Sequence, residues 1–121
     1  MVRRFLASYP ASEVNEFFSH DAVYIDGPRG VHRGTDAIQT EFQTVRSMAP
    51  NVTVDIKALA VSGSTVLTER VDSFEINGEV ISFEVVGIFD FGSGGRITRW
   101  RDYYDWTTFQ EQIRAALAAH G

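Results

Sequence analysis

The segment Thr65–Phe74, TVLTERVDSF, predicts the β-strand around which the rest of the chain is arranged. Its β-branched and aliphatic residues suit a pleated surface, and Gly63 precedes it as a turn residue. Because side chains alternate between the faces of a strand, one face carries Val66, Thr68, Arg70, Asp72 and Phe74. A charged side chain on an apolar face is costly unless it is paired. Arg70 and Asp72 therefore form either a structural ion pair or part of a functional site.

The segments around this strand continue the pattern of alternating residues. Three more strands are predicted, at Val52–Val61, Glu79–Phe91 and Ile97–Asp105. Turns are expected at Ser62–Ser64 and Gly92–Gly95, and Asn77-Gly78 is a dipeptide that favours a tight β-hairpin. The second half of the chain therefore predicts four consecutive antiparallel strands.

Helical patterns occur in the first half of the chain and at its end. The predicted helices are Val2–Ser8, Glu13–Ser19 with Ser12 as N-cap, Asp36–Met48 with Thr35 as N-cap and Pro50 at its end, and Thr108–Ala119 with Thr107 as N-cap. The first two are separated by Pro10 and form either two helices or one helix bent at the proline. A short strand is expected at Ala22–Asp26, and the glycines and proline of Gly27–Gly34 predict a loop.

This order of elements predicts an α+β fold, in which three to four helices pack on one face of a strongly curved, mixed or antiparallel sheet. Such a sheet forms a cone with a deep pocket between the sheet and the helices. The layout resembles the NTF2-like, or SnoaL-like, fold. We expect one domain over residues 1–121. Because one fold hosts many functions, the function has to be argued from the site.

Composition argues against several classes of function. The net charge of -5 comes without a basic patch, which disfavours binding to nucleic acid. The absence of cysteine excludes disulfides and thiolate chemistry. No apolar run approaches the roughly 20 residues of a membrane span, and no signal-peptide pattern opens the chain, so we expect a cytoplasmic protein without a membrane partner. The three histidines, His20, His32 and His120, lack the spacing of metal ligands.

Three sets of polar residues on alternate strand positions are candidates for one site. They are Tyr24 with Asp26, Arg70 with Asp72, and Trp100 with Asp102 and Tyr104. Each set mixes polar groups with aromatic or apolar neighbours. If the three strands bend around one cavity, an arginine lies among carboxylates in an apolar pocket.

Such an arrangement separates the protonation states of the acids. Two carboxylates close together cannot both ionise cheaply, and burial raises their pKa values. An arginine between them offsets this repulsion and can hold both through its fork of donors. One protonated acid and one carboxylate result, which is an acid and a base in one site at neutral pH. Together with a water held by Tyr24, this set suits the one-step opening of a strained ring, without a metal or cofactor.

At these residues the chain resembles the limonene-1,2-epoxide hydrolases, in ERVD at Glu69–Asp72 and WRDYYD at Trp100–Asp105. The resemblance implies Asp72 as the general acid, Asp102 as the base that activates water, Arg70 as the bridge between them and Tyr24 as the tyrosine that binds the water. It further implies a small or medium lipophilic epoxide as substrate, no cofactor and a homodimer. Pocket-wall positions fall on Phe83, Val85, Trp100 and Tyr104, the last of which replaces a phenylalanine of the family.

Asp26 departs from the family, which has an asparagine at this position. An aspartate can accept a hydrogen bond from the water but cannot donate one when ionised, and it adds a third negative charge near Asp102. Asp26 is therefore expected either to take up a proton or to share the role of the base.

Two other functions remain open. The segment DAVYIDGP also resembles the part of ketosteroid isomerases that carries a proton-shuttling aspartate, so that Asp26 would be the base of an isomerase or polyketide cyclase. That chemistry needs oxyanion donors, and their positions fall on Phe5 and Gly87. A third possibility is a pocket that binds a hydrophobic ligand without catalysis, for which a buried acid–base set would be a cost without a purpose.

Overall fold

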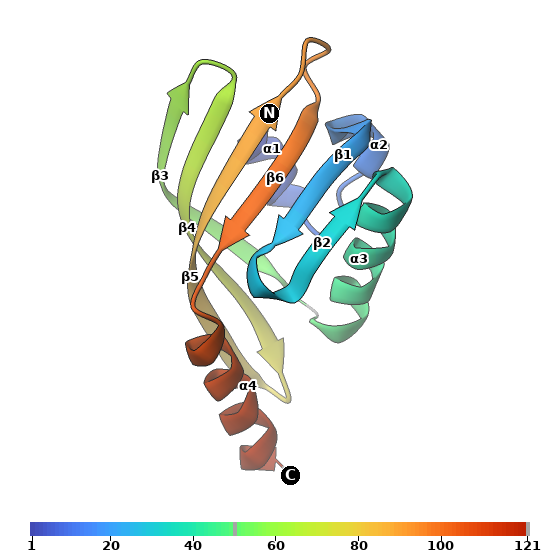
Figure 1. The fold of residues 1–121 in the computed structure, drawn as a ribbon. Coiled ribbons are helices and arrows are strands. Elements are labelled where there is room, and N and C mark those ends of the chain that lie inside the picture. The colour runs from blue at the N-terminus through green and yellow to red at the C-terminus, as the bar shows by residue number, and fades with distance from the viewer. Residues whose placement is uncertain (50, 121) are drawn as a thin grey trace.

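A six-stranded sheet forms the body of the molecule in the computed structural model, which describes residues 1–49 and 51–120 (Figure 1). The strands are β1 (Phe18–Asp26), β2 (Gly30–Arg33), β3 (Thr53–Ser62), β4 (Thr65–Ile76), β5 (Glu79–Phe91) and β6 (Ile97–Tyr103). Their order across the sheet is β2-β1-β6-β5-β4-β3. The strands β3 to β6 are antiparallel neighbours, as predicted, whereas β1 pairs with β6 in parallel. The sheet is therefore mixed, and β1 brings the first half of the chain against β6.

The strand β2 was missed in the sequence, because its segment carries the glycines and proline of a loop. After the short 3-10 helix Gly27–Arg29, the chain reverses and pairs antiparallel with β1, from Val23 opposite Arg33 to Asp26 opposite Gly30. The strand β1 also begins earlier than predicted, at Phe18, and has an irregular register against β6 between Phe18 and Val23. Both differences extend the sheet at the edge where Asp26 lies.

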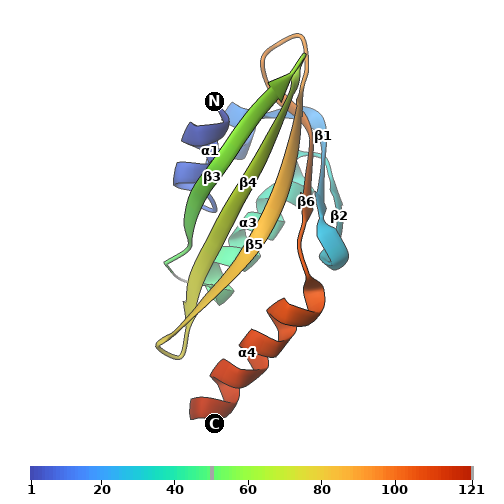
Figure 2. The ribbon, with the colours of Figure 1, turned by 90° about the vertical axis from the view of Figure 1, so that its left-hand side faces the viewer.

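Helices cover one face of the sheet and its lower end. They are α1 (Val2–Ser8), α2 (Val14–Phe17), α3 (Thr35–Met48) and α4 (Trp106–His120). Figure 2 shows α1 and α3 on the same side of the sheet, with α4 beyond the lower end of the strands. The other face carries no helix, so the α+β architecture with a curved, open sheet agrees with the prediction. Within the described residues, none of the helices has the length and apolar character needed to cross a membrane.

An aromatic core lies between α1, α3 and the upper part of the sheet. Phe5 is fully buried at its centre, where its ring lies 5.1 Å from that of Trp100 and 5.3 Å from those of Phe17 and Phe18. Phe42 from α3 closes the cluster. A second, smaller cluster joins α4 to the lower part of β4 and β5. The first cluster positions β1 and β6, and the second holds α4 against the sheet.

The predicted alternation of β4 is confirmed by its burial. Thr68, Arg70, Asp72 and Phe74 are buried on the helix side, whereas Leu67, Glu69 and Glu75 on the other side are exposed. Two charged residues are therefore buried on the same face as the core.

The predicted helix caps were wrong. Three of the helices lie within two residues of their predicted bounds, whereas α2 ends at Phe17 and the predicted helix continued to Ser19. Ser12 donates to the carbonyl of Phe5 and ties α1 to the following turn instead of capping α2. Thr35 is the first residue of α3, after Gly34, and Pro50 lies outside the described residues. The cap of α4 is Asp105, whose carboxylate accepts from the backbone of Thr107 and Thr108. These ends depend on local contacts that periodicity does not reveal.

Candidate active site

Four neighbouring strands place a row of site residues side by side. Thr68 of β4 lies opposite Gly87 of β5, Gly87 opposite Asp102 of β6, and Asp102 beside Asp26 of β1. Arg70 and Asp72 follow Thr68 along the same face of β4. The register of the sheet, set by the hairpins between the strands, therefore brings all three predicted polar sets to one region.

Arg70 joins two carboxylates from different strands. Its Nε donates to Oδ1 of Asp72 at 2.9 Å and its Nη2 to Oδ2 of Asp72 at 3.0 Å. Its Nη1 donates to Oδ1 of Asp102 at 2.9 Å and its Nη2 to Oδ2 of Asp102 at 2.6 Å. Arg70 is 2% exposed, Asp102 4% and Asp72 7%. One buried positive charge is thus held in two bidentate ion pairs, a geometry that arginine can provide and lysine cannot.

Gly87 provides the space that this bridge needs. A Cβ atom at this position would lie 2.4 Å from Nη1 of Arg70, 2.8 Å from Oδ1 of Asp102 and 3.0 Å from Oγ1 of Thr68. The guanidinium therefore crosses β5 over a residue that has no side chain. The isomerase alternative requires an acidic donor side chain at this position, but the guanidinium of Arg70 fills the space that such a side chain would occupy.

Asp102 is the most heavily hydrogen-bonded carboxylate of the three. Besides Arg70, the indole N–H of Trp100 donates to its Oδ1 at 2.7 Å. A carboxylate oxygen can accept about two hydrogen bonds, so Oδ1 is occupied, whereas Oδ2 accepts one bond and can accept another. Burial raises the pKa of Asp102 from 3.8 to about 6 against the lowering effect of Arg70, and the charges of Asp72 and Asp26 add to the rise. A carboxylate with this pKa is ionised at neutral pH and is a stronger base than an ordinary aspartate.

Trp100, which the sequence predicted to lie in a pocket wall or in the core, lies in the core. It is fully buried, and its ring is stacked between those of Tyr24 at 4.0 Å and Phe89 at 5.4 Å. Its contact with the site is the hydrogen bond to Asp102. In this structure Trp100 therefore orients the carboxylate and is not placed to touch a substrate.

Tyr24, the predicted water-binding tyrosine, stacks on the indole that donates to Asp102. Its register partner on β6 is Trp100, and its side chain is 2% exposed. Burial raises the pKa of its hydroxyl, and neighbouring Tyr9, Asp26 and Asp102 raise it further, so Tyr24 keeps its proton. No described residue forms a hydrogen bond with this hydroxyl.

Asp26 is engaged by two residues that the sequence did not associate with it. Its Oδ1 accepts from the hydroxyl of Tyr104 at 3.1 Å, and its Oδ2 forms an ion pair with Nη1 of Arg29 at 3.1 Å. Arg29 also contacts Glu41 of α3, and His32 lies 3.4 Å from the same carboxylate. Burial raises the pKa of Asp26, whereas Arg29 and Tyr104 lower it. The negative charge of Asp26, the third acid near Asp102, thus has Arg29 as its positive partner.

The predicted pocket-wall residues lie below the triad, near α4. Phe83 is half-buried, and its ring lies 5.3 Å from Tyr104 and 4.8 Å from Phe109. Val85 is buried opposite Arg70. Tyr104 joins this aromatic group through its ring and Asp26 through its hydroxyl. An apolar wall therefore stands next to Asp72, whose partner on β5 is Phe83.

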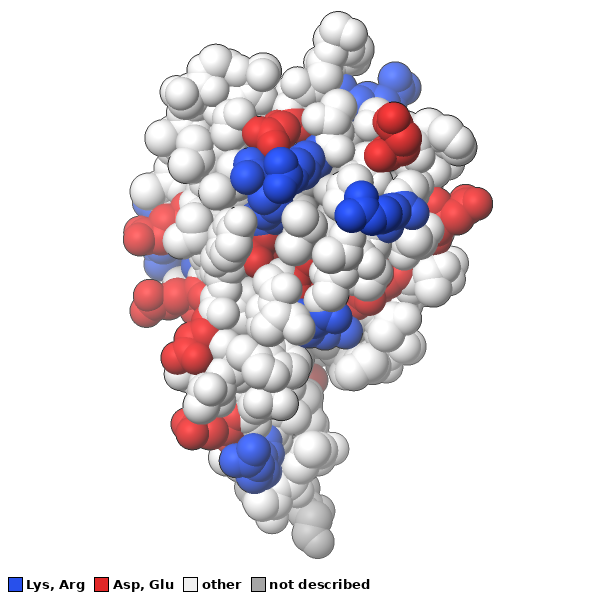
Figure 3. Space-filling model, in the orientation of Figure 1, with Lys and Arg blue, Asp and Glu red and all other residues white. Residues whose placement is uncertain are grey.

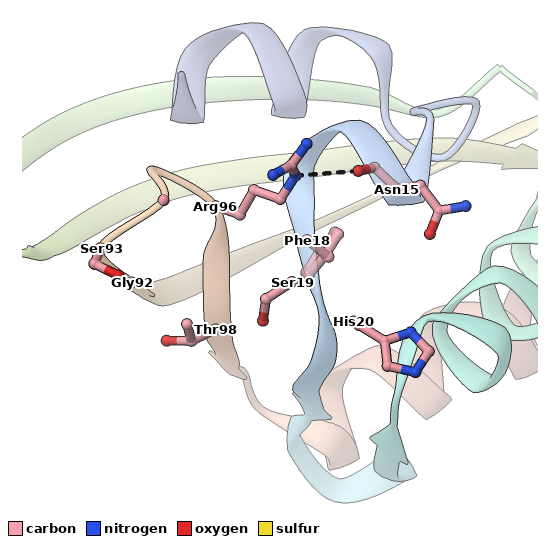
Figure 4. Close-up of a pocket in the computed structure, with 9 residues that line it drawn as sticks. Asn15, Phe18, Ser19, His20, Gly92, Ser93, Arg96 and Thr98 are labelled. Carbon is pink, nitrogen blue, oxygen red and sulfur yellow. Dashed lines mark hydrogen bonds between the residues drawn. The ribbon is translucent and has the colours of Figure 1, made fainter.

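Two surface clefts lie away from the triad. One, of about 440 Å³, is formed by the start of β1 and the turn between β5 and β6, where Arg96 donates to the carbonyl of Asn15 (Figure 4). The other, of about 420 Å³, lies at the start of α4 and includes Phe83. No triad residue lines either cleft, so a deep pocket at the triad stays a prediction.

Comparison with known proteins identifies the family of the domain. Residues 2–100 match the SnoaL-like domain. The chain belongs to the SnoaL-like domain family. One curated relative is the epoxide hydrolase EphG of Mycobacterium tuberculosis, with 39% identity over 66 residues, which are 54% of this chain and 44% of that protein. The match thus spans less than half the length of this relative.

Solved structures of other SnoaL-like and related proteins have the same fold. A Mycobacterium tuberculosis LEH-like epoxide hydrolase has a TM-score of 0.80 and 28% identity, covering 98% of this chain and 90% of its own. A protein with a ketosteroid isomerase-like fold from Catenulispora acidiphila, in complex with trimethylamine, has a TM-score of 0.81 and 24% identity, covering 92% and 89%. The second likeness concerns the fold alone.

Three residues of this SnoaL-like site were missed in the sequence. Arg29 lay in a predicted loop, Glu41 was one polar residue of an amphipathic helix, and Tyr9 followed a short helix before a proline. Burial raises the pKa of Tyr9, and so do the charges of Asp26, Asp102 and Asp72. A motif search along the strands could not find these residues, because none of them lies at an alternating position of a predicted strand.

Gly87→Ala should destabilise the protein, because its methyl group would displace the guanidinium of Arg70 from Asp102. We expect a loss of about 1–3 kcal/mol in the free energy of unfolding, the usual cost of overpacking. Urea denaturation measures it. Gly94→Ala is the matched control, since a Cβ there would have no atom within 4 Å. Equal stability of both variants would contradict the described bridge.

The raised pKa of Asp102 predicts a dependence of stability on pH. The folded carboxyl keeps its proton up to a pKa of about 6, against 3.8 for the ordinary group, so between these values the folded state binds more protons than the unfolded state. In that window this group lowers the free energy of unfolding as the pH rises. Denaturation of wild type and Asp102→Asn between about pH 4 and 6 should show the more negative slope in wild type. Identical slopes would contradict the assignment.

Proposed function

We propose that this SnoaL-like protein is a cofactor-independent epoxide hydrolase of the limonene-1,2-epoxide hydrolase type. The observation that carries the proposal is the buried Arg70, shared by carboxylates from β4 and β6. The relatives described as epoxide hydrolases support the same reaction. The substrate would be a small or medium lipophilic epoxide, and the product a vicinal diol.

The proposed reaction is a single acid–base step. A water held near Tyr24 gives a proton to Oδ2 of Asp102 while its oxygen forms a bond to one epoxide carbon. The carbon–oxygen bond of the ring breaks, and the ring oxygen takes the proton of Asp72. Arg70 stays charged throughout and stabilises whichever carboxylate is ionised. Afterwards Asp102 carries a proton and Asp72 does not, and exchange with water restores the starting state.

The site disfavours the isomerase or cyclase alternative. Gly87 carries no donor, and Phe5 lies in the aromatic core with no polar atom to offer. Asp26, the base of that alternative, accepts from Tyr104 and Arg29. A pocket that only binds an apolar ligand would gain nothing from a buried set of charges that costs desolvation energy.

Asp72→Asn and Asp102→Asn should each lower the rate of diol formation by about 10²–10⁴-fold, because each removes one partner of the proton transfer. Limonene oxide, cyclohexene oxide and styrene oxide form the substrate panel, and the diol is measured by chromatography. Asp90→Asn is the control, since Asp90 pairs with Arg101 outside the triad. Asp26→Asn should leave diol formation in place, whereas it would abolish the activity of an isomerase that uses Asp26 as its base. Absence of diol from the whole panel, or a full rate in Asp102→Asn, would overturn the proposal.

We also propose a homodimer through the face of the sheet that no helix covers. Leu67, Val86 and Tyr103 are 37%, 45% and 51% exposed there, and the register places Ile88 beside Leu67 and Tyr103 beside Val86. Figure 3 views this side of the molecule, where scattered charges stand among a larger uncharged area. A self-complementary patch of this kind suits a two-fold axis.

Light scattering after gel filtration should give the mass of two chains for wild type. Val86→Glu should give one chain, because it buries a charge at the centre of the patch. Val80→Glu, 65% exposed near the β4–β5 turn, should remain dimeric. A monomeric wild type would overturn this proposal and leave the hydrolase proposal intact.

A further inference from the structure

Tyr9 follows α1 and packs against the residues that orient Asp102. Its ring lies edge-on to that of Trp100 at 5.6 Å and to that of Phe42 at 5.0 Å. The same indole is stacked on Tyr24 and donates to Asp102. Tyr9 and Tyr24 therefore both contact Trp100, which together with Arg70 holds the proposed base.

The hydroxyl of Tyr9 lies near the charges of the site. Burial is the main cause that raises its pKa, and the charges of Asp26, Asp102 and Asp72 raise it further, whereas Arg70 lowers it. Tyr9 also raises the pKa of Tyr24, so the two hydroxyls are close enough to interact. Both phenols consequently keep their protons at any pH at which the protein works.

Neither hydroxyl has a protein partner. In the part of the chain that the structure describes, no hydrogen bond is formed by the hydroxyl of Tyr9 or of Tyr24, although the carboxylates around them have several. Neither hydroxyl oxygen is among the fully enclosed side-chain atoms that lack a partner in the described residues, so each opens onto space that a small molecule can reach. Two such hydroxyls beside one carboxylate point to a bound oxygen atom as their partner.

Asp26 can act only as an acceptor for these hydroxyls, and each of its oxygens can accept about one hydrogen bond beyond the one it has. Each of its oxygens already accepts from a protein donor, Tyr104 on one side and Arg29 on the other. Its charge is the largest of the neighbouring charges acting on Tyr9. The hydrogen of the Tyr9 hydroxyl is thus drawn toward Asp26, and its oxygen is left to accept a hydrogen bond.

We infer that Tyr9 and Tyr24 together hold the attacking water, so that Tyr9 is a further positioning residue of the reaction. The inference rests on the proposed hydrolase function. One hydrogen of the water goes to Asp102 and the other to the oxygen of Tyr9. Tyr24 donates to one lone pair of the water, and the second lone pair stays free to attack the epoxide carbon. Both hydrogens and both lone pairs of the water are then assigned, and none of them needs Asp26.

Tyr9→Phe tests the inference through the turnover number and the choice of carbon. Styrene oxide is hydrolysed in water labelled with ¹⁸O, and mass spectrometry locates the label on either carbon of the diol. We expect kcat to fall about tenfold or more with KM within about twofold, and the label to spread between the carbons. The melting temperature should stay the same or rise, because the lost hydroxyl has no protein partner. Ser64→Ala, which removes an exposed hydroxyl from the turn between β3 and β4, is the control.

Three results would overturn the inference: an unchanged kcat and label position, a rise in KM alone, and a loss of activity that follows a lower melting temperature. A high-resolution crystal structure tests it without turnover. An ordered water within hydrogen-bond distance of Tyr9, Tyr24 and Asp102 supports the inference, and a Tyr9 hydroxyl that contacts no ordered water overturns it. If wild type forms no diol but holds this water, the hydrolase proposal fails while the placement of the two phenols stands.

Discussion

A buried guanidinium that must satisfy two carboxylates across an intervening strand is the constraint on which the rest of the structure depends. Arg70 starts on β4, and Asp102 lies two strands away on β6. The span is possible because β5 presents Gly87 at the crossing point. Removing Arg70 would leave two acids without a counter-charge in the interior, where the cost of an unpaired ion is several kcal/mol. The ion pairs of Arg70 therefore form only if the register of β4, β5 and β6, the glycine at position 87 and both acids are all in place.

The site contains two groups in which one arginine pairs with two acids. Arg70 stands between Asp72 and Asp102, and Arg29 stands between Asp26 and Glu41. In each group two acids share one arginine, so each retains an excess of negative charge that favours the uptake of a proton. In the first group burial is the main cause that raises the pKa of Asp102, and the charge of Asp72 adds to the rise. Asp72 and Asp102 titrate as a coupled pair, so the positions of water and substrate decide which of them acts as acid and which as base. In the proposed reaction the tyrosine hydroxyls near Asp102 hold the water there, which makes Asp102 the base.

The sequence was sufficient for the parts of the site that depend on periodicity. Alternation along β4, β5 and β6 placed Arg70, Asp72 and Asp102 on one face, and the hairpin at Asn77-Gly78 set their register. It was insufficient where the backbone is irregular. Arg29 reaches Asp26 because a loop with two glycines of positive φ folds back into β2, and Tyr9 reaches the site after a break between α1 and α2. Trp100 was expected to line a pocket because aromatic residues usually do, and only its hydrogen bond to Asp102 identifies it as support for the base.

The same architecture explains why one fold can serve different reactions and why this chain favours one of them. In this sheet the central position of β5 decides what occupies the space between β4 and β6. A donor side chain at that position would face the site directly and would exclude an arginine that crosses the strand. With glycine there, the arginine crosses and converts two separate acids into a coupled pair. Asp26 lies at the edge of that pair, in an ion pair with Arg29. Its place where the limonene-1,2-epoxide hydrolases have an asparagine is compatible with the proposed hydrolysis, because two phenols are available for the water.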